Sequence, residues 1–249
     1  MKTHVWQRTF VLWLGLVVFA NEIWQIVSGN LSSSWIILTF LVYYLIALSI
    51  TVGYHRLFTH NSFKCGKFWH YLFGIVGCVS VNSSPVQWSI VHYNHHKYSD
   101  TDKDPHLVSW KYFFRLFDGH GLEVSKGQVR LMRDPFHNFL VNYSFGLFLL
   151  AGIVLYLVDI NLFLYGLLSP IGLYLFNGGI HTIYVHRNGQ PRNYWPLEFL
   201  FPTAGEWNHR VHHEVPINPY FNGEGTAIDL GGWLIGVIRN DCRISDRKA

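Results

Sequence analysis

The sequence predicts an all-α integral membrane protein with four transmembrane helices in two hairpins, beneath a cap that holds a histidine-rich dimetal site. Half of the 249 residues are hydrophobic and only 14% are charged. A run of about 20 apolar residues crosses a ~30 Å hydrocarbon core. Four runs reach that length, at about 9–27, 35–54, 139–158 and 162–183.

The first run is interrupted near its end by Asn21 and Glu22, and it follows an opening M-K-T-H that is compatible with a signal peptide. The residues around Val18 and Ala20 do not supply a convincing small-residue cleavage pattern. We therefore expect a retained anchor. The second run, at 35–54, contains no charge and is the clearest span.

A fifth apolar stretch at 68–81 has 14 residues and contains His70. It is too short to span comfortably. If it did span, the histidine motifs before and after it would lie on opposite sides of the membrane. We expect an interfacial or re-entrant helix here, and the runs at 139–158 and 162–183 then form the second hairpin.

The distribution of Lys and Arg predicts which side of the membrane each end of the hairpins faces. None of the 19 Lys and Arg residues lies in the two tight connections, at 28–34 and 159–161. By the positive-inside rule these tips face the exported side. The loop regions at 55–67, 84–137 and 184–249 then form one cytoplasmic cap, together with both termini.

One domain covering 1–249 is expected, because no repeat, low-complexity tract or long Pro/Gly/Ser linker divides the chain. Cys65, Cys78 and Cys242 are an odd count without C-x-x-C spacing, so the sequence indicates neither a disulfide framework nor a thiolate metal site. The formal net charge of +4 is less informative than where the cations fall, and we expect membrane lipid but no nucleic acid as a partner.

Fifteen histidines are present, and eight fall into three spaced boxes. The boxes are H-R-L-F-T-H, H-Y-N-H-H and H-R-V-H-H, which contain His55, His60, His92, His95, His96, His209, His212 and His213. On a helix, positions i, i+3 and i+4 share a face, so each H-x-x-H-H presents three imidazoles in one direction. Imidazole is a common ligand of iron, zinc and copper. Eight imidazoles on one side of the membrane predict a site for two metal ions.

Polar residues near the boxes extend this site. His181 lies near the cytoplasmic end of the fourth run, one helical turn after Asn177, and ionisable residues in spans are functional candidates. We expect a ligand role for His181, with an interfacial role as the alternative, and a water-mediated contact for Asn177. Asp104 and Glu206 flank boxes and are expected to orient ligating imidazoles.

The histidine motifs resemble those of the membrane fatty acyl desaturases, the stearoyl-CoA desaturase type in particular. The similar runs are Y-H-R-L-F-T-H-N-S-F, H-Y-N-H-H-K-Y-S-D-T-D-K-D-P-H and G-E-W-N-H-R-V-H-H-E-V-P. The resemblance covers roughly residues 35–240. It implies two iron ions held by nine histidines, with Asn177 acting through water; the implied ligands are His55, His60, His92, His95, His96, His181, His209, His212 and His213.

The resemblance also implies the reaction. Two Fe²⁺ ions would use O₂ as co-substrate and two external electrons to place a cis double bond in a saturated fatty acyl chain. No haem-binding or ferredoxin segment is fused, so the expected donor is a separate protein such as cytochrome b5 or a ferredoxin. Arg210 in box three and the short segment after His106 depart from the family pattern, which leaves the carrier open between CoA, acyl-carrier protein and lipid.

Two other readings stay open. Histidine-box fatty acid hydroxylases and alkane monooxygenases use similar clusters, and spacing does not separate hydroxylation from desaturation. A membrane metal transporter is the alternative of another class. Transporters bind their cargo near the bilayer midplane, whereas eight of these histidines lie outside the spans.

Overall fold

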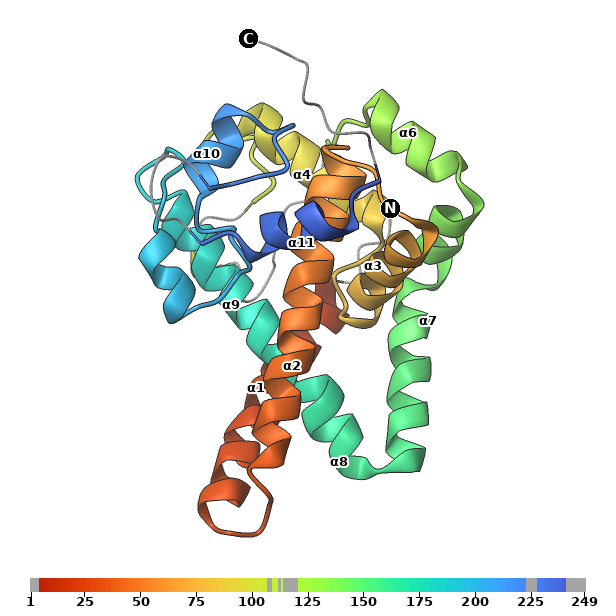
Figure 1. Cartoon of the computed structure of the whole chain (residues 1–249), viewed down its shortest axis with the longest axis vertical. Coiled ribbons are helices and arrows are strands. Elements are labelled where there is room, and N and C mark those ends of the chain that lie inside the picture. The colour runs from red at the N-terminus through yellow and green to blue at the C-terminus, as the bar shows by residue number, and fades with distance from the viewer. Residues whose placement is uncertain (1–4, 107–108, 112, 114–120, 223–227, 241–249) are drawn as a thin grey trace.

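The computed structural model describes residues 5–106, 109–111, 113, 121–222 and 228–240. Within these ranges the chain is helical, with no named strand, as the sequence predicted. Figure 1 shows a narrow stem of long helices beneath a broader cap. The elements are α1 (Val5–Val27), α2 (Ser34–Leu48), η1 (Ser49–Thr59), α3 (Lys67–Val79), α4 (Pro85–Tyr98), α6 (Lys126–Arg133), α7 (Pro135–Val158), α8 (Ile160–Phe163), η2 (Leu164–Leu168), α9 (Ser169–Val185), η3 (Trp195–Phe199), α10 (His209–Glu214) and α11 (Leu230–Ile238).

Four helical segments in the described chain are long and apolar enough to cross a membrane, which confirms the expected number. They are Trp6–Val27, Ser34–Thr59, Pro135–Val158 and Ile160–Val185. The second is longer than its apolar run, because α2 continues into the π-helix η1. π-helical turns are frequent at functional sites, and η1 carries box one upward into the cap.

The two hairpins meet where α1 crosses α9. A Cβ atom placed on Gly15 would lie 2.7 Å from the Cα of Gly172, and a Cβ on Gly172 would lie 2.7 Å from the Cα of Gly15. Only glycine at both positions lets the two backbones touch. Helices in a bilayer associate through such small-residue contacts, because lipid supplies no hydrophobic drive.

The two polar residues that interrupt the first run both bond to other helices. Glu22 is fully buried, and its carboxylate accepts hydrogen bonds from Thr39 Oγ1 at 2.8 Å and Ser169 Oγ at 2.7 Å. Asn21 donates to the Tyr165 hydroxyl at 3.0 Å. These bonds satisfy polar groups that would be costly in hydrocarbon, and they connect α1 to α2, η2 and α9.

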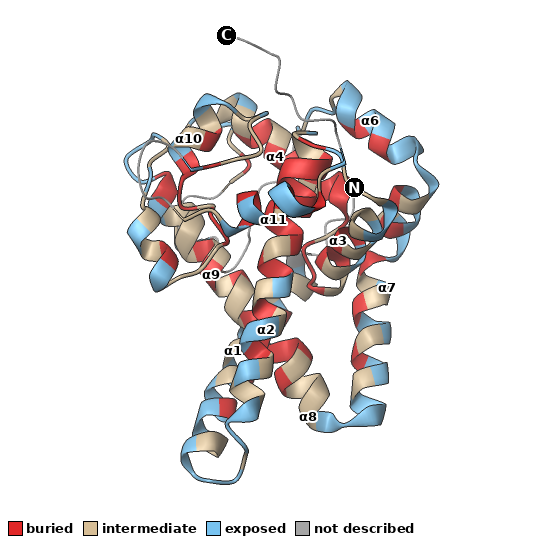
Figure 2. Ribbon diagram, viewed as in Figure 1, coloured by how far each residue is buried: buried red, intermediate tan, exposed pale blue. Residues whose placement is uncertain are grey.

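The short apolar stretch forms α3, which packs on η1 and α7. Phe73 lies over Gly53, and the Tyr54 ring lies over Gly77. Figure 2 shows that buried residues gather in the cap and the upper stem, whereas α7 is largely exposed below the cap. Only 17% of the α7 spanning window is buried within the protein, which is the pattern of a helix that faces lipid.

Candidate metal centre

Three elements deliver the box histidines to one place in the cap. Box one lies at the end of η1, box two on α4 and box three on α10. The start of α4 is fixed by a capping box between Ser84 and Gln87, with Pro85 in the first turn. Such caps satisfy the free N–H groups of a helix start, so the position of box two along α4 is well defined.

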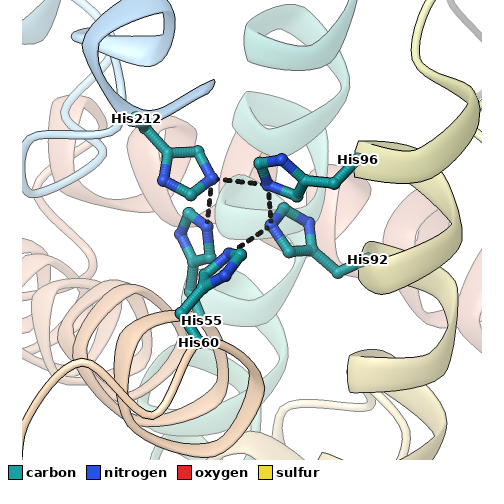
Figure 3. A group of neighbouring side chains, drawn as sticks. All are labelled: His55, His60, His92, His96 and His212. Carbon is teal, nitrogen blue, oxygen red and sulfur yellow. Dashed lines mark hydrogen bonds between the residues drawn. The ribbon is translucent and has the colours of Figure 1, made fainter. Parts of the chain in front are cut away.

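Five imidazoles form the first group: His55, His60, His92, His96 and His212. Their candidate ligand nitrogens all lie within 4.8 Å of one another. Four Nε2–Nε2 contacts join them in a chain, shown in Figure 3: His55 to His212 at 2.9 Å, His212 to His96 at 2.7 Å, His96 to His92 at 3.0 Å, and His92 to His60 at 3.2 Å.

Four imidazoles form the second group: His95, His186, His209 and His213. Their Nε2 atoms also contact one another, with His186 to His209 at 2.8 Å, His209 to His213 at 3.0 Å, and His95 to His213 at 3.3 Å. The two groups are adjacent, because the rings of His96 and His213 stack with centroids 4.4 Å apart.

Each H-x-x-H-H box divides between the two groups. The i and i+4 members of box two, His92 and His96, join the first group, and the i+3 member, His95, joins the second. Box three does the opposite, since His209 and His213 join the second group and His212 joins the first. On a helix, i and i+4 lie about 40° apart and i+3 lies about 60° to the other side, so one box faces two sites.

Three histidines each have a carboxylate at the Nδ1 atom of the ring. The Nδ1 atom of His55 contacts Glu206 at 2.9 Å, that of His95 contacts Asp104 at 3.0 Å, and that of His186 contacts Asp100 at 3.2 Å. A carboxylate at Nδ1 fixes the tautomer in which Nδ1 carries the proton. The Nε2 lone pair of each ring then points into its group, which is the orientation a metal ligand needs.

A shared cation explains the nitrogen–nitrogen contacts of the first group better than hydrogen bonds between the rings do. A neutral imidazole nitrogen is either a donor of one proton or an acceptor. The His55 Nε2 atom is an acceptor, because its Nδ1 atom carries the proton. Donors and acceptors must then alternate along the chain of contacts, so that His212 and His92 are the donors. Each of these two donors has one proton but makes two contacts. At most two of the four contacts are therefore ordinary hydrogen bonds, whereas one cation satisfies all five lone pairs.

Burial also keeps several of the imidazoles neutral, as ligands must be. Burial, reinforced by neighbouring histidines, lowers the pKa of His213 to about 3. The same causes hold the pKa of His92, His95, His209 and His212 well below the ordinary value of histidine. An all-imidazole donor set of this kind suits iron, zinc or copper.

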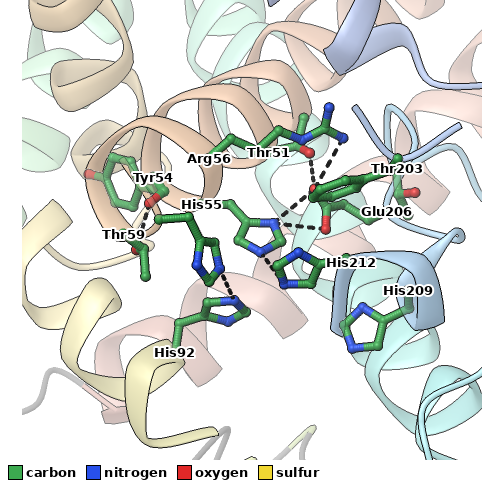
Figure 4. Close-up of polar contacts among 12 residues, drawn as sticks. Thr51, Tyr54, His55, Arg56, Thr59, His92, Thr203, Glu206, His209 and His212 are labelled. Carbon is green, nitrogen blue, oxygen red and sulfur yellow. Dashed lines mark hydrogen bonds and ion pairs between the residues drawn. The ribbon is translucent and has the colours of Figure 1, made fainter. Parts of the chain in front are cut away.

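A buried charge network supports the first group (Figure 4). Arg56 is fully buried and binds both carboxylate oxygens of Asp229, at 2.9 and 3.1 Å, and its Nη2 lies 3.8 Å from Glu206. Glu206 also accepts a hydrogen bond from Thr51. Burial alone would raise the pKa of Glu206, but His55 and Arg56 outweigh it and lower that pKa to about 2. Glu206 is therefore an anion beside His55.

His181 and Asn177 line the same cavity as four of the grouped imidazoles and lie beside the two groups. The His181 Nε2 atom contacts the backbone oxygen of Glu206 at 2.9 Å, and His181 belongs to neither imidazole group. The Asn177 amide nitrogen donates to the Pro202 carbonyl at 2.8 Å and contacts the Tyr43 hydroxyl, while its Oδ1 is buried without a hydrogen-bond partner among the described residues. That oxygen can accept from a water.

His186, which the sequence analysis did not single out, belongs to the second imidazole group. It lies one residue beyond α9, five residues after His181, and Asp100 holds its ring. The sequence carried a signal for it, since it is another histidine close after a candidate ligand at the end of a span. His106 was also overlooked; its ring stacks on His95 at 4.1 Å, and with His95 and Asp104 it forms a third group of potential ligands.

A cavity of about 140 Å³ lies beside both imidazole groups. His55 and His92 of the first group and His186 and His209 of the second line it. Side chains from α2, η1, α4 and α9 complete the wall, among them Ala47, Ile50, Trp88, Val91, Tyr174 and Val185. The cavity is therefore a partly apolar space that touches both candidate metal positions.

Comparisons with known proteins agree on one kind of enzyme. The chain is 27% identical to a probable chloroplastic lipid desaturase of Arabidopsis thaliana, over 94% of this chain and 70% of that protein. It is 25% identical to an sn-1 stearoyl-lipid 9-desaturase of Anabaena variabilis, over 98% and 95%. It is 28% identical to a probable acyl-CoA desaturase of Schizosaccharomyces pombe, over 86% and 48%. No family model matches the chain.

Proposed function

This chain belongs to the membrane fatty acyl desaturase family, and from that premise we propose that it places a cis double bond in a saturated fatty acyl chain. The reaction uses O₂ and two electrons from a separate protein, and removes one hydrogen from each of two neighbouring methylenes. The observation that carries this proposal is that nine imidazoles form two adjacent groups, and that members of both groups line one cavity.

The proposed ligands are the eight box histidines and His186. His55, His60, His92, His96 and His212 would hold the first ion, and His95, His186, His209 and His213 would hold the second. Iron, when bound there, supplies the redox chemistry that zinc lacks. His181 acts by holding the backbone of Glu206, and Asn177 acts through water at its buried Oδ1.

The cavity walls position the substrate. A methylene has no polar handle, so selectivity for one carbon pair depends on holding the chain in one register beside the metals. Ile50, Val91 and Tyr174 offer apolar contacts along this cavity. Trp88 stacks on His92 at 4.7 Å, which fixes one ligand and one wall together. These contacts also keep bulk water from the reacting carbons.

We further propose that the cap, the metal centre and both termini face the cytoplasm. The support is the absence of Lys and Arg from the connections at 28–34 and 159–161. The donor, a cytochrome b5 or a ferredoxin, would then dock on the cap. Electrostatic attraction governs the rate of such encounters.

Mass spectrometry of total fatty acids tests the function. A host lacking its own desaturase should gain monounsaturated chains when it expresses this protein, and lose them again with His96→Ala. The control is His70→Ala, since His70 lies outside both groups and this variant should keep the product. Hydroxylated chains in place of alkenes would instead identify a hydroxylase. Unchanged lipids, with folded iron-loaded protein and donor both present, would refute the proposal.

A further inference from the structure

A second hollow, which we call the outer pocket, adjoins the cavity beside the imidazole groups. It encloses about 830 Å³, whereas the inner cavity encloses about 140 Å³. The loop after α4 forms one wall, and the end of α9 with the segment that follows it forms the other. His106 and His186 line both spaces. These two imidazoles therefore lie at the boundary between the outer pocket and the inner cavity.

The charges that line the outer pocket differ in depth. Asp102 is exposed, whereas the side chains of Asp100 and Asp104 are only 12% and 4% exposed. Two cations, Lys111 and Arg187, also line the pocket, and both are exposed. Water and salt screen exposed charges strongly and buried charges much less. The deep end of the outer pocket is therefore dominated by carboxylates and attracts cations.

His106 and Asp104, together with His95, form a third group of potential metal ligands at this deep end. Their candidate ligand atoms all lie within 4.8 Å of one another. The backbone N–H of His106 donates to the Asp104 Oδ1 atom at 2.8 Å, which fixes the loop beside the carboxylate. No hydrogen bond joins either ring nitrogen of His106 to another residue in the described part of the chain. Imidazole and carboxylate are both ligands of divalent first-row metals.

This third group binds a cation more weakly than the two imidazole groups do. The His95 Nε2 atom already contacts His213 at 3.3 Å, and its Nδ1 atom contacts Asp104. The Asp104 carboxylate also accepts from the backbone N–H groups of Asp100 and His106. A cation here relies mainly on the His106 ring and on water. Because that ring stacks on His95 with centroids 4.1 Å apart, the second imidazole group is the next set of ligands that the cation meets.

We propose that divalent metal reaches the imidazole groups through the outer pocket. Asp102 attracts the hydrated ion, His106 and Asp104 hold it transiently, and it then passes between His106 and His186. Removing a charge from water is costly, and a halfway position lets the ion exchange its waters for protein ligands in steps. This inference rests on the proposed ligand set for the destination of the ion, and not on the reaction that the loaded protein performs.

The rate of metal loading tests the route. The full-length apo chain in detergent is mixed with Co²⁺, and the visible absorption of the bound ion follows the filling of the imidazole groups. Charge at the mouth of a cleft raises association rates by about 10-fold or more. We expect Asp102→Asn and His106→Gln to load about tenfold more slowly than the wild type. Both variants should still reach two ions per chain by metal analysis, which shows that they are folded.

Glu123→Gln and His70→Gln are the matched controls. Glu123 is an exposed carboxylate of the cap that pairs with Lys97 beside box two, and it does not line the outer pocket. His70 is a partly exposed histidine outside all three groups of potential ligands. Both controls should load at the wild-type rate. A separate equilibrium measurement at excess Co²⁺ should find a third, weaker ion in the wild type that is missing in His106→Gln.

The outcomes separate the route from the function. Slow loading to two ions in Asp102→Asn and His106→Gln, with normal rates in the controls, supports the route, and it does so even if the iron-loaded protein desaturates no lipid or thioester, which would refute the function alone. Wild-type loading rates in both variants would overturn the route. Equal slowing in Glu123→Gln would also overturn it, because the effect would then come from the overall charge of the cap. Fewer than two ions in His106→Gln would make His106 a permanent ligand and refute its transient role.

Discussion

Glu206 is the carboxylate whose removal most directly tests how the metal centre is held. It lies 2.9 Å from the His55 Nδ1 atom, accepts from Thr51 and lies 3.8 Å from Arg56. Glu206→Gln keeps the shape but replaces the anion with a neutral amide. Arg56 keeps its two bonds to Asp229. The substitution therefore removes mainly the contact between the carboxylate and His55.

The expected size of the effect follows from the role of outer carboxylates. Loss of such a partner lowers metal affinity by about 10- to 100-fold, which is about 1.4–2.7 kcal/mol. We expect Glu206→Gln to lose iron at chelator concentrations that leave the wild type loaded. Equilibrium dialysis against graded chelator, with iron counted by mass spectrometry, measures this shift.

The matched control is Glu214→Gln. Glu214 also flanks box three, but its side chain is 62% exposed and pairs with exposed Arg210. Exposed pairs contribute about 0–1 kcal/mol, and the iron affinity of this variant should equal that of the wild type. Equal iron affinity in Glu206→Gln and Glu214→Gln would refute the orienting role of the buried carboxylate.

Three further predictions test the ligand set and the fold. His186→Ala should lower bound iron to one ion per chain or fewer, whereas His181→Ala should keep two; the reverse result, by metal analysis, would restore His181 as the ligand. Gly15→Leu should lower the melting temperature in detergent because its side chain meets the α9 backbone, while Gly146→Leu, with open space around it, should not; equal melting would contradict the close crossing. Ser84→Ala removes the α4 cap and should cost about 0.5–2 kcal/mol, measured by thermal unfolding, and an unchanged midpoint would deny the cap that role.

The helical spans and most of the site were predictable from sequence because their signals are local. Spanning length and missing charge identified four helices, and the i, i+3, i+4 spacing identified His92, His95 and His96 as a unit. The partition of that unit between two groups was not predictable, because it depends on where η1 and α10 meet α4. Spacing gives the face of one helix, and only packing decides what that face meets.

The place of His186 in the site also could not be predicted from local sequence. Its ring is held by Asp100, which lies 86 residues earlier in the chain, and no local pattern connects the two. Asp104 and Glu206 were predicted as orienting groups, and the structure places both at Nδ1 atoms of box histidines. Asp100 holds the Nδ1 atom of His186 in the same way.

The division of each H-x-x-H-H box has a consequence for assembly. Since α4 and α10 each supply ligands to both groups, an ion that orders one group also orders the backbone that carries the other. The second ion then binds a partly organised site and costs less conformational entropy. Metal loading should accordingly be cooperative, with few chains holding a single ion during maturation, and apo protein should convert to the fully loaded form over a narrow range of free iron.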